Sequence, residues 1–158
     1  MIHLAKAGLL HLIRIYDDVV IPKEVKHEIV DIGKANGYSD AFLVEKAIKN
    51  GWIKVIEVKV NEEFARITRM AGLHDAEIGV IYYAYQNRVT ALLDEDSARV
   101  FARSLGVDVK GSLGLLIEGL REGLITREGG LKGLDKLADV MYLSASVYKL
   151  VLKEIEKW

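Results

Sequence analysis

TALLDEDSARVFARSL occupies residues 90–105, and it joins a strand to a helix through three consecutive acidic residues. Residues 90–93 are mainly apolar, which is typical of a short parallel strand that is covered on both faces. Asp94, Glu95 and Asp96 come directly after this segment, and a helical pattern begins after them at Ser97. The stretch therefore predicts a strand, an acidic turn and a helix, which is a building unit of an α/β fold.

The rest of the chain repeats this alternation of strand and helix. Further strands are predicted at residues 19–21, 53–60 and 107–109. Helices are predicted at residues 2–16, 23–31, 39–47, 62–70, 74–87, 112–122, 131–140 and 144–157. This order indicates a three-layer α/β/α fold with a central parallel sheet. No repeat or linker interrupts the pattern, so we expect a single domain over residues 1–158.

The composition is that of a folded protein with nearly balanced charge. Hydrophobic residues make up 51% and charged residues 28% of the chain, which argues against disorder. The net charge is -1, so there is no global basic field for nucleic acid. No cysteine is present, which excludes disulfides and thiolate metal sites. The chain shows no signal peptide and no apolar run long enough for a bilayer, so we expect a cytoplasmic protein that does not enter membranes.

The acidic turn after residue 93 is the first candidate for chemistry. In open parallel sheets the active crevice lies outside the carboxyl ends of the strands, where Asp94 is expected. Carboxylates that crowd together repel one another, and a divalent cation commonly offsets that repulsion. Asp96 has an alternative role as the start of the next helix. Asp94 stands directly at the strand end and has the weaker structural explanation.

Two further acidic segments lie at the starts of predicted helices. Glu24 and Glu28 are four residues apart and project from one helix face, although for either residue alone an ordinary solvated helix surface is the preferred interpretation. Asp75 opens the most apolar helix and is either a cap or a ligand. Glu77 shares a side with apolar residues, where an unpaired carboxylate would be costly to bury. For Asp75, the cap and the ligand both remain open.

The chemistry of these side chains limits the choice of metal. A set of carboxylates without cysteine suits Mg²⁺ or Mn²⁺ better than zinc. Ions of this kind activate water for attack on a phosphodiester and stabilise the leaving oxygen. The residues alone thus suggest a metal-dependent phosphoesterase as one hypothesis beside helix capping.

A series of segments in this chain resembles the prokaryotic PIN-domain proteins, in particular a toxin-like subgroup. The matching segments are residues 2–10 (IHLAKAGLL), residues 20–22 with Val25 and Glu28, residues 74–77 (HDAE), residues 92–96 (LLDED) with Arg99, and residues 111–114 (GSLG). Each segment is a loose motif, whereas their common order and spacing make the resemblance more specific. The likeness covers nearly the whole chain.

The resemblance implies a PIN-like, Rossmann-like fold and a metal-dependent ribonuclease. Glu28, Asp75 and Asp94 would be the catalytic and metal-binding acids, and Glu77 and Asp96 would be further ligands of Mg²⁺ or Mn²⁺. The substrate would be RNA, and Arg99 and Ser112 would lie beside it. Many members are toxins that a small antitoxin protein inhibits, and many are homodimers, so both partners are expected here.

The beginning of the chain departs from the family pattern. PIN proteins start with a strand that ends in an aspartate, and this chain begins at Met1 inside the segment that follows. The first family strand and its acid are therefore missing, which predicts weakened metal binding and impaired catalysis. It also predicts an unpaired strand edge.

Two other functions remain open beside the nuclease. The first is a catalytically inactive PIN-like scaffold that dimerises or binds a partner, and it would be favoured if the acids point apart. The second is a small-molecule enzyme, which is disfavoured because no glycine-rich phosphate loop follows any strand.

Overall fold

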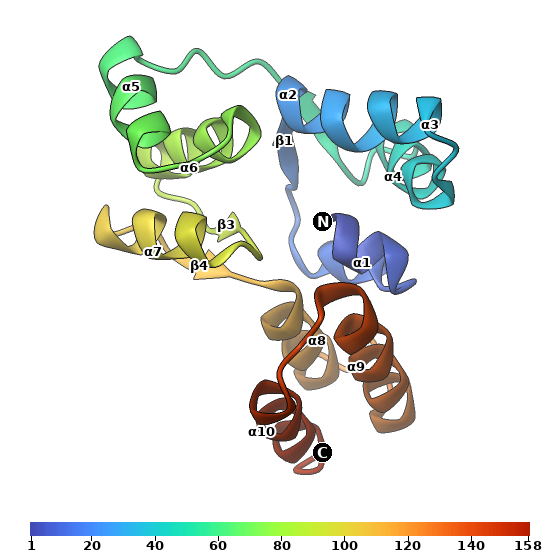
Figure 1. Ribbon diagram of the computed structural model, residues 1–158. Coiled ribbons are helices and arrows are strands. Elements are labelled where there is room, and N and C mark those ends of the chain that lie inside the picture. Colours follow the sequence, from blue (N-terminus) through green and yellow to red (C-terminus); the bar gives the residue numbers. More distant parts are fainter. The chain divides into compact units, whose positions relative to one another are not determined.

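The computed structural model describes residues 1–158 as a mostly helical α/β protein (Figure 1). The chain separates into two compact units. Unit 1 comprises Met1–Asp17 and Gly111–Trp158, and unit 2 comprises Asp18–Lys110. None of the helices combines the length and the apolarity that crossing a membrane requires. The expectation of one domain over residues 1–158 stays a prediction.

Unit 2 contains all four strands. They are β1 (Val20–Pro22), β2 (Lys54–Ile56), β3 (Ala91–Leu92) and β4 (Val109–Lys110). β1 pairs with β2 and β3 pairs with β4, both in parallel. The parallel pairing confirms the α/β class. The strands form two separate two-stranded sheets, however, whereas the sequence predicted one central sheet. β1 pairs only with β2, and β3 pairs only with β4, so no backbone hydrogen bonds join the two sheets.

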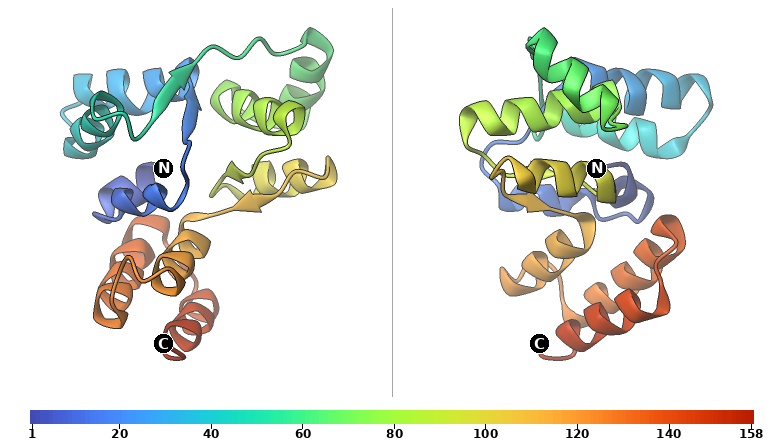
Figure 2. Two further views of the ribbon diagram at one scale, coloured as in Figure 1. Left: turned by 180° about the vertical axis from the view of Figure 1, so that it is seen from behind. Right: turned by 60° about the vertical axis from the view of Figure 1, so that its left-hand side comes forward.

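Helices of unit 2 follow the strands in the predicted order. They are α2 (Lys23–Lys26), the π-helical turn η2 (His27–Ile32), α3 (Gly33–Ala35), α4 (Ser39–Lys49), α5 (Glu62–Met70), α6 (Asp75–Asn87) and α7 (Asp96–Ser104). The segment from α2 to α3 winds on without a break and packs against α4 (Figure 2, blue to cyan). Pro22 ends β1 and stands directly before α2, where its missing N–H costs nothing. Asn61 caps α5, because its side chain accepts the N–H groups of Glu63 and Phe64.

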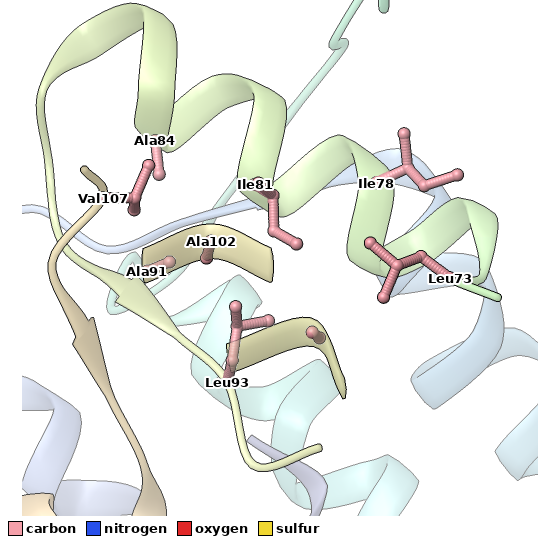
Figure 3. Close-up of a cluster of buried hydrophobic side chains, with 9 residues drawn as sticks. Leu73, Ile78, Ile81, Ala84, Ala91, Leu93, Ala102 and Val107 are labelled. Carbon is pink, nitrogen blue, oxygen red and sulfur yellow. The ribbon is translucent and has the colours of Figure 1, made fainter. Parts of the chain in front are cut away.

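One apolar cluster holds α6, β3 and α7 together. Figure 3 shows Ile81 of α6 pointing toward the side of Ala91 and Leu93, and Ala84 of the same helix beside Val107. Ile81 is completely buried. The cluster also includes Leu73, Ile78, Ala98, Ala102 and Val107. This core supports the two places where the sequence puts acids, the start of α6 and the end of β3.

Unit 1 is helical. Its elements are α1 (Ile2–Lys6), the 3-10 helix η1 (Leu10–Ile15), α8 (Ser112–Arg121), α9 (Arg127–Met141) and α10 (Ala145–Ile155). Glycines allow close packing here, since a Cβ at Gly119 would lie 2.6 Å from Leu12 Cδ2 and one at Gly133 3.0 Å from Leu116 Cδ1. α8 and α9 consequently pack closely against their neighbours.

We expect Gly33→Ala to destabilise the protein, although alanine is the better helix former. A Cβ at Gly33 would lie 2.9 Å from the Ala41 Cβ, which is attached to the backbone of α4 and cannot turn away. Overpacking of this kind costs about 1–3 kcal/mol, which outweighs the gain of about 1 kcal/mol in helix propensity. Urea unfolding would measure the change.

The control is Gly129→Ala in α9, where the nearest atoms lie 3.4 and 3.6 Å from the new Cβ. These are ordinary contacts, so the substitution should raise the free energy of unfolding by about 0.5–1 kcal/mol. Equal effects of the two substitutions would refute the packing argument.

Candidate functional site

Glu28 lies on the helical segment that follows β1. It is exposed and occupies the second position of the π-helical turn η2. Turns of this kind are rare, and they are frequent at functional sites. Glu28 therefore lies in a kind of turn that is associated with function. The sequence pattern predicted an ordinary helix here and did not reveal this turn.

The neighbouring acid Asp31 has structural partners. Lys26 Nζ donates a hydrogen bond to Asp31 Oδ1 at 2.7 Å, and His27 Nδ1 lies 3.3 Å from the other carboxylate oxygen. The hydrogen bond from Lys26 holds the pKa of the Asp31 carboxyl below its ordinary value. Asp31 is thus engaged along the same turn that presents Glu28.

We expect Lys26→Met to raise the pKa of the Asp31 carboxyl toward its ordinary value, because the largest stabiliser of the carboxylate is removed. Since the pKa is lowered in the folded protein, this pair stabilises the fold above the ordinary carboxyl pKa. That stabilisation is lost as the pH falls through the lowered value. NMR titration of the carboxyl would measure the shift. Lys46→Met, at an exposed lysine of α4, should leave it unchanged.

Two acids stand at the start of α6, and both have partners. Arg69 Nε donates to Asp75 Oδ1 at 3.0 Å, and both side chains are largely exposed. An exposed pair of this kind contributes little to stability, so Asp75 is easily redirected. Glu77 Oε2 accepts the backbone N–H of His74 at 3.0 Å, which is the reciprocal half of a capping box. Glu77 therefore has a capping role, which the sequence analysis had considered for Asp75 and not for Glu77.

Asp94 follows the buried residue Leu93, just beyond the end of β3. The Leu93 N–H donates to the Lys110 carbonyl at 2.9 Å, which fixes the backbone immediately before Asp94. Asp94 is half-buried, whereas Glu95 and Asp96 are exposed. Asp96 is the first residue of α7 and so also has a position typical of a helix start. Of the three consecutive acids, Asp94 is thus the most enclosed.

The two residues expected beside the substrate lie in different units. Arg99 is half-buried in α7, and its Nε is buried without a hydrogen-bond partner. A buried donor that lacks an acceptor costs about 1–3 kcal/mol, and such groups often mark functional sites. Ser112 is buried at the first position of α8 in unit 1. The roles of both residues stay predictions.

A buried carboxylate elsewhere escaped the sequence analysis. Asp40 in the first turn of α4 is 7% exposed, and its Oδ2 has no hydrogen-bond partner. Its position behind Ser39 is that of an ordinary helix start, so no pattern could single it out.

The carboxylates do not form a ready metal centre. No group of three or more histidine or acidic side chains is placed so that it could hold an ion. The Asp75 carboxylate accepts a hydrogen bond from Arg69, and the Glu77 carboxylate accepts one from the His74 N–H. Fewer carboxylate oxygens are therefore free to bind a metal ion. As arranged here, these residues therefore do not fit Mg²⁺ or Mn²⁺. The assignment of Glu28, Asp75, Glu77, Asp94 and Asp96 as ligands stays a prediction.

Comparison with known proteins gives one match. No curated protein and no solved structure matches the chain. The model of the family DUF3368, which is described as a PIN domain, matches residues 1–157. The match spans nearly all of both units, and it includes every acid discussed above. The chain therefore belongs to the DUF3368 PIN domain family.

Proposed function

We propose that this chain is a PIN-type endoribonuclease that depends on Mg²⁺ or Mn²⁺. The observation that carries the proposal is the family match over residues 1–157, because PIN domains are typically nucleases. The proposal includes the three-layer α/β/α arrangement of the PIN fold. It also includes RNA as the substrate, and a toxin–antitoxin module with a small protein inhibitor as the setting. Homodimerisation of the toxin belongs to the same proposal.

Glu28, Asp75 and Asp94 are the acids that we propose to carry the activity. Glu28 lies on the helical segment that follows β1, Asp75 opens α6, and Asp94 lies two residues beyond the end of β3. Glu77 and Asp96 are proposed as further ligands. Arg99 would contact the RNA, because its Nε lacks an acceptor and a guanidinium group suits the geometry of a phosphate.

Activity requires these acids to come closer together than they lie here. The movement is inexpensive for Glu28 and Asp75, since both side chains are exposed and the bond from Arg69 to Asp75 is a weak surface pair.

A second candidate function is a catalytically inactive scaffold that binds a partner. The specific observation in its favour is that no set of ligands is assembled. Both candidates use the same fold, and they differ in whether a divalent ion binds and RNA is cut.

Calorimetric titration with Mn²⁺ and a cleavage assay on single-stranded RNA test the proposal together. We expect binding of Mn²⁺ and cleavage that stops when a chelator is added. Glu63→Gln is the matched control, because Glu63 is an exposed acid of α5 that lies outside the proposed site. It should behave like the unaltered protein. If neither binding nor cleavage occurs, the nuclease is ruled out and the partner-binding scaffold is favoured.

A further inference from the structure

Two exposed asparagines of unit 2 stand directly before glycine. The chain has four asparagines, of which Asn36 precedes Gly37 and Asn50 precedes Gly51. Asparagine is a thermolabile residue, because its side-chain carbonyl carbon can react with the backbone nitrogen of the next residue. Glycine hinders that approach least, since it has no Cβ. These two pairs therefore have the composition of a modification site that the proposed nuclease does not use.

The other two asparagines are held by their own hydrogen bonds. Asn61 Oδ1 accepts the N–H groups of Glu63 and Phe64 at 2.9 and 3.2 Å. Asn87 Nδ2 donates to the Tyr83 carbonyl at 2.9 Å. Neither asparagine is followed by glycine. Both are therefore internal controls for the reactivity of the first two.

The folded backbone keeps the reacting atoms of both pairs apart. Asn36 and Asn50 have ψ angles of 1° and -2°. Ring closure requires the glycine nitrogen to turn toward the asparagine Cβ, a rotation of roughly 120° because Cα is tetrahedral. The Gly37 N–H is also engaged, since it donates to the Lys34 carbonyl at 3.0 Å, and the Gly51 N–H is bonded in the same way. The reaction at either site therefore requires the helix end to open first.

The helix end at Asn36 has less support than the helix end at Asn50. Residues 35–39 are all exposed, whereas Asn50 is soon followed by the half-buried Trp52 and by Ile53, which is 1% exposed. α3 is a three-residue turn behind the π-helical turn η2, whereas α4 is a regular helix of 11 residues. Local opening costs less free energy where fewer buried contacts hold the backbone. The end of α3 should therefore open more often than the end of α4.

We propose that Asn36 is a site of spontaneous deamidation whose rate is controlled by opening of the end of α3. The Gly37 nitrogen forms a bond to Asn36 Cγ, the Cγ–Nδ2 bond breaks, and ammonia leaves with the proton of the Gly37 N–H. Water then opens the cyclic imide at one of its two carbonyls, which gives aspartate or isoaspartate and restores the glycine N–H. No electrons are transferred. This chemistry goes beyond the proposed nuclease and does not depend on metal.

Either product would loosen the contact between α3 and α4. Aspartate places a negative charge at the C-cap of α3, where the helix macrodipole opposes it. Isoaspartate adds a carbon to the backbone before Gly37, which disturbs the hydrogen bond from the Tyr38 N–H to the Gly33 carbonyl at 2.9 Å. Gly33 lies directly against Ala41 of α4. The modification would thus act at the end of the same helical segment that presents Glu28.

Peptide mapping by mass spectrometry of the full chain, stored at mildly alkaline pH, tests the proposal. The replacement of NH2 by OH changes the mass of a peptide, and chromatography separates aspartate from isoaspartate. We expect Asn36 to react at least about fivefold faster than Asn50, which corresponds to about 1 kcal/mol in the free energy of opening. Asn61 and Asn87 should stay intact. The proposal is wrong if Asn36 is not modified, or if Asn50 reacts as fast.

The same measurement in guanidinium chloride separates the effect of structure from that of sequence. In the unfolded chain both asparagines precede a glycine and then an aromatic residue, Tyr38 or Trp52. We therefore expect nearly equal rates at the two sites, and both should exceed the rates in the folded protein. If the two rates differ as much as they do in the folded protein, local sequence sets the difference, and control by helix opening is refuted.

Gly33→Ala tests the control by opening with a variant. Its new Cβ would lie 2.9 Å from the Ala41 Cβ, so the contact between α3 and α4 is strained. We expect deamidation at Asn36 to accelerate about fivefold or more relative to Asn50, for a loss of about 1 kcal/mol at this helix end. Gly129→Ala in α9 is the matched control and should leave both rates unchanged. An unchanged rate at Asn36 in the Gly33 variant would overturn the proposal.

Discussion

Replacing Asp94 with asparagine is expected to lower the rate of RNA cleavage about a hundredfold or more, which is typical for the loss of one electrostatic group in an active site. Asp94 follows the buried residue Leu93, and it is more enclosed than Glu95 and Asp96. Asparagine keeps the shape and removes the charge. The measurement is the initial rate on single-stranded RNA at saturating Mn²⁺, together with the calorimetric affinity for that ion.

Glu95→Gln is the matched control, since it removes a neighbouring exposed charge from the N-cap position of α7. We expect at most a small change in rate. If both variants lose activity alike, the effect comes from the total negative charge of the segment. If Asp94→Asn cleaves RNA normally, Asp94 has no catalytic role.

Ile81→Ala in α6 is expected to lower the free energy of unfolding of unit 2 by about 2–5 kcal/mol. Ile81 is 0% exposed at the centre of the cluster that joins α6 to β3. Removing its outer carbons loses the burial of apolar surface and leaves a cavity that the rigid helix cannot close. Urea unfolding followed by circular dichroism would measure the loss.

Ile67→Ala in α5 provides the comparison, because this isoleucine is 47% exposed. A substitution on the surface should change stability by only about 0.5 kcal/mol. A loss at Ile81 no greater than the loss at Ile67 would mean that the cluster contributes little to the stability of unit 2.

Local patterns predicted many elements because the responsible interactions are close in sequence. The helix predicted over residues 62–70 is confirmed as α5, and Asn61 caps it with its own side chain. The strand and helix predicted within residues 90–105 are confirmed as β3 and α7. Local patterns failed where backbone conformation or distant pairing decided. The helix predicted over residues 2–16 is divided into α1 and η1, and Gly8 between them has a φ of +72°.

The extent of the strands depended on tertiary structure. Residues 53–60 have the composition of one long strand, yet only Lys54–Ile56 are paired. β1 has three residues and ends at Pro22. Residues of β2 beyond Ile56 therefore have no strand beside them with which to form hydrogen bonds. β-propensity expresses mainly whether a residue suits a sheet surface, and it does not reveal how long the neighbouring strand is.

The candidate site shows the same division. The positions of Glu28, Asp75 and Asp94 relative to the strands and helices could be predicted. The order of elements along the chain and the starts of the helices follow from apolar periodicity. The partners of these acids could not be predicted. Arg69 lies six residues before Asp75, and whether their side chains meet depends on how the turn between α5 and α6 is folded.

By itself, the sequence determined the α/β class, the order of elements and the family, because each depends on local residue patterns repeated along the chain. Tertiary structure alone decided that the strands form two sheets, that α6 lies against both, and that the acids stand without a common ligand set. The physical reason is that these features depend on distances between side chains far apart in sequence. Packing sets those distances, and periodicity does not encode them.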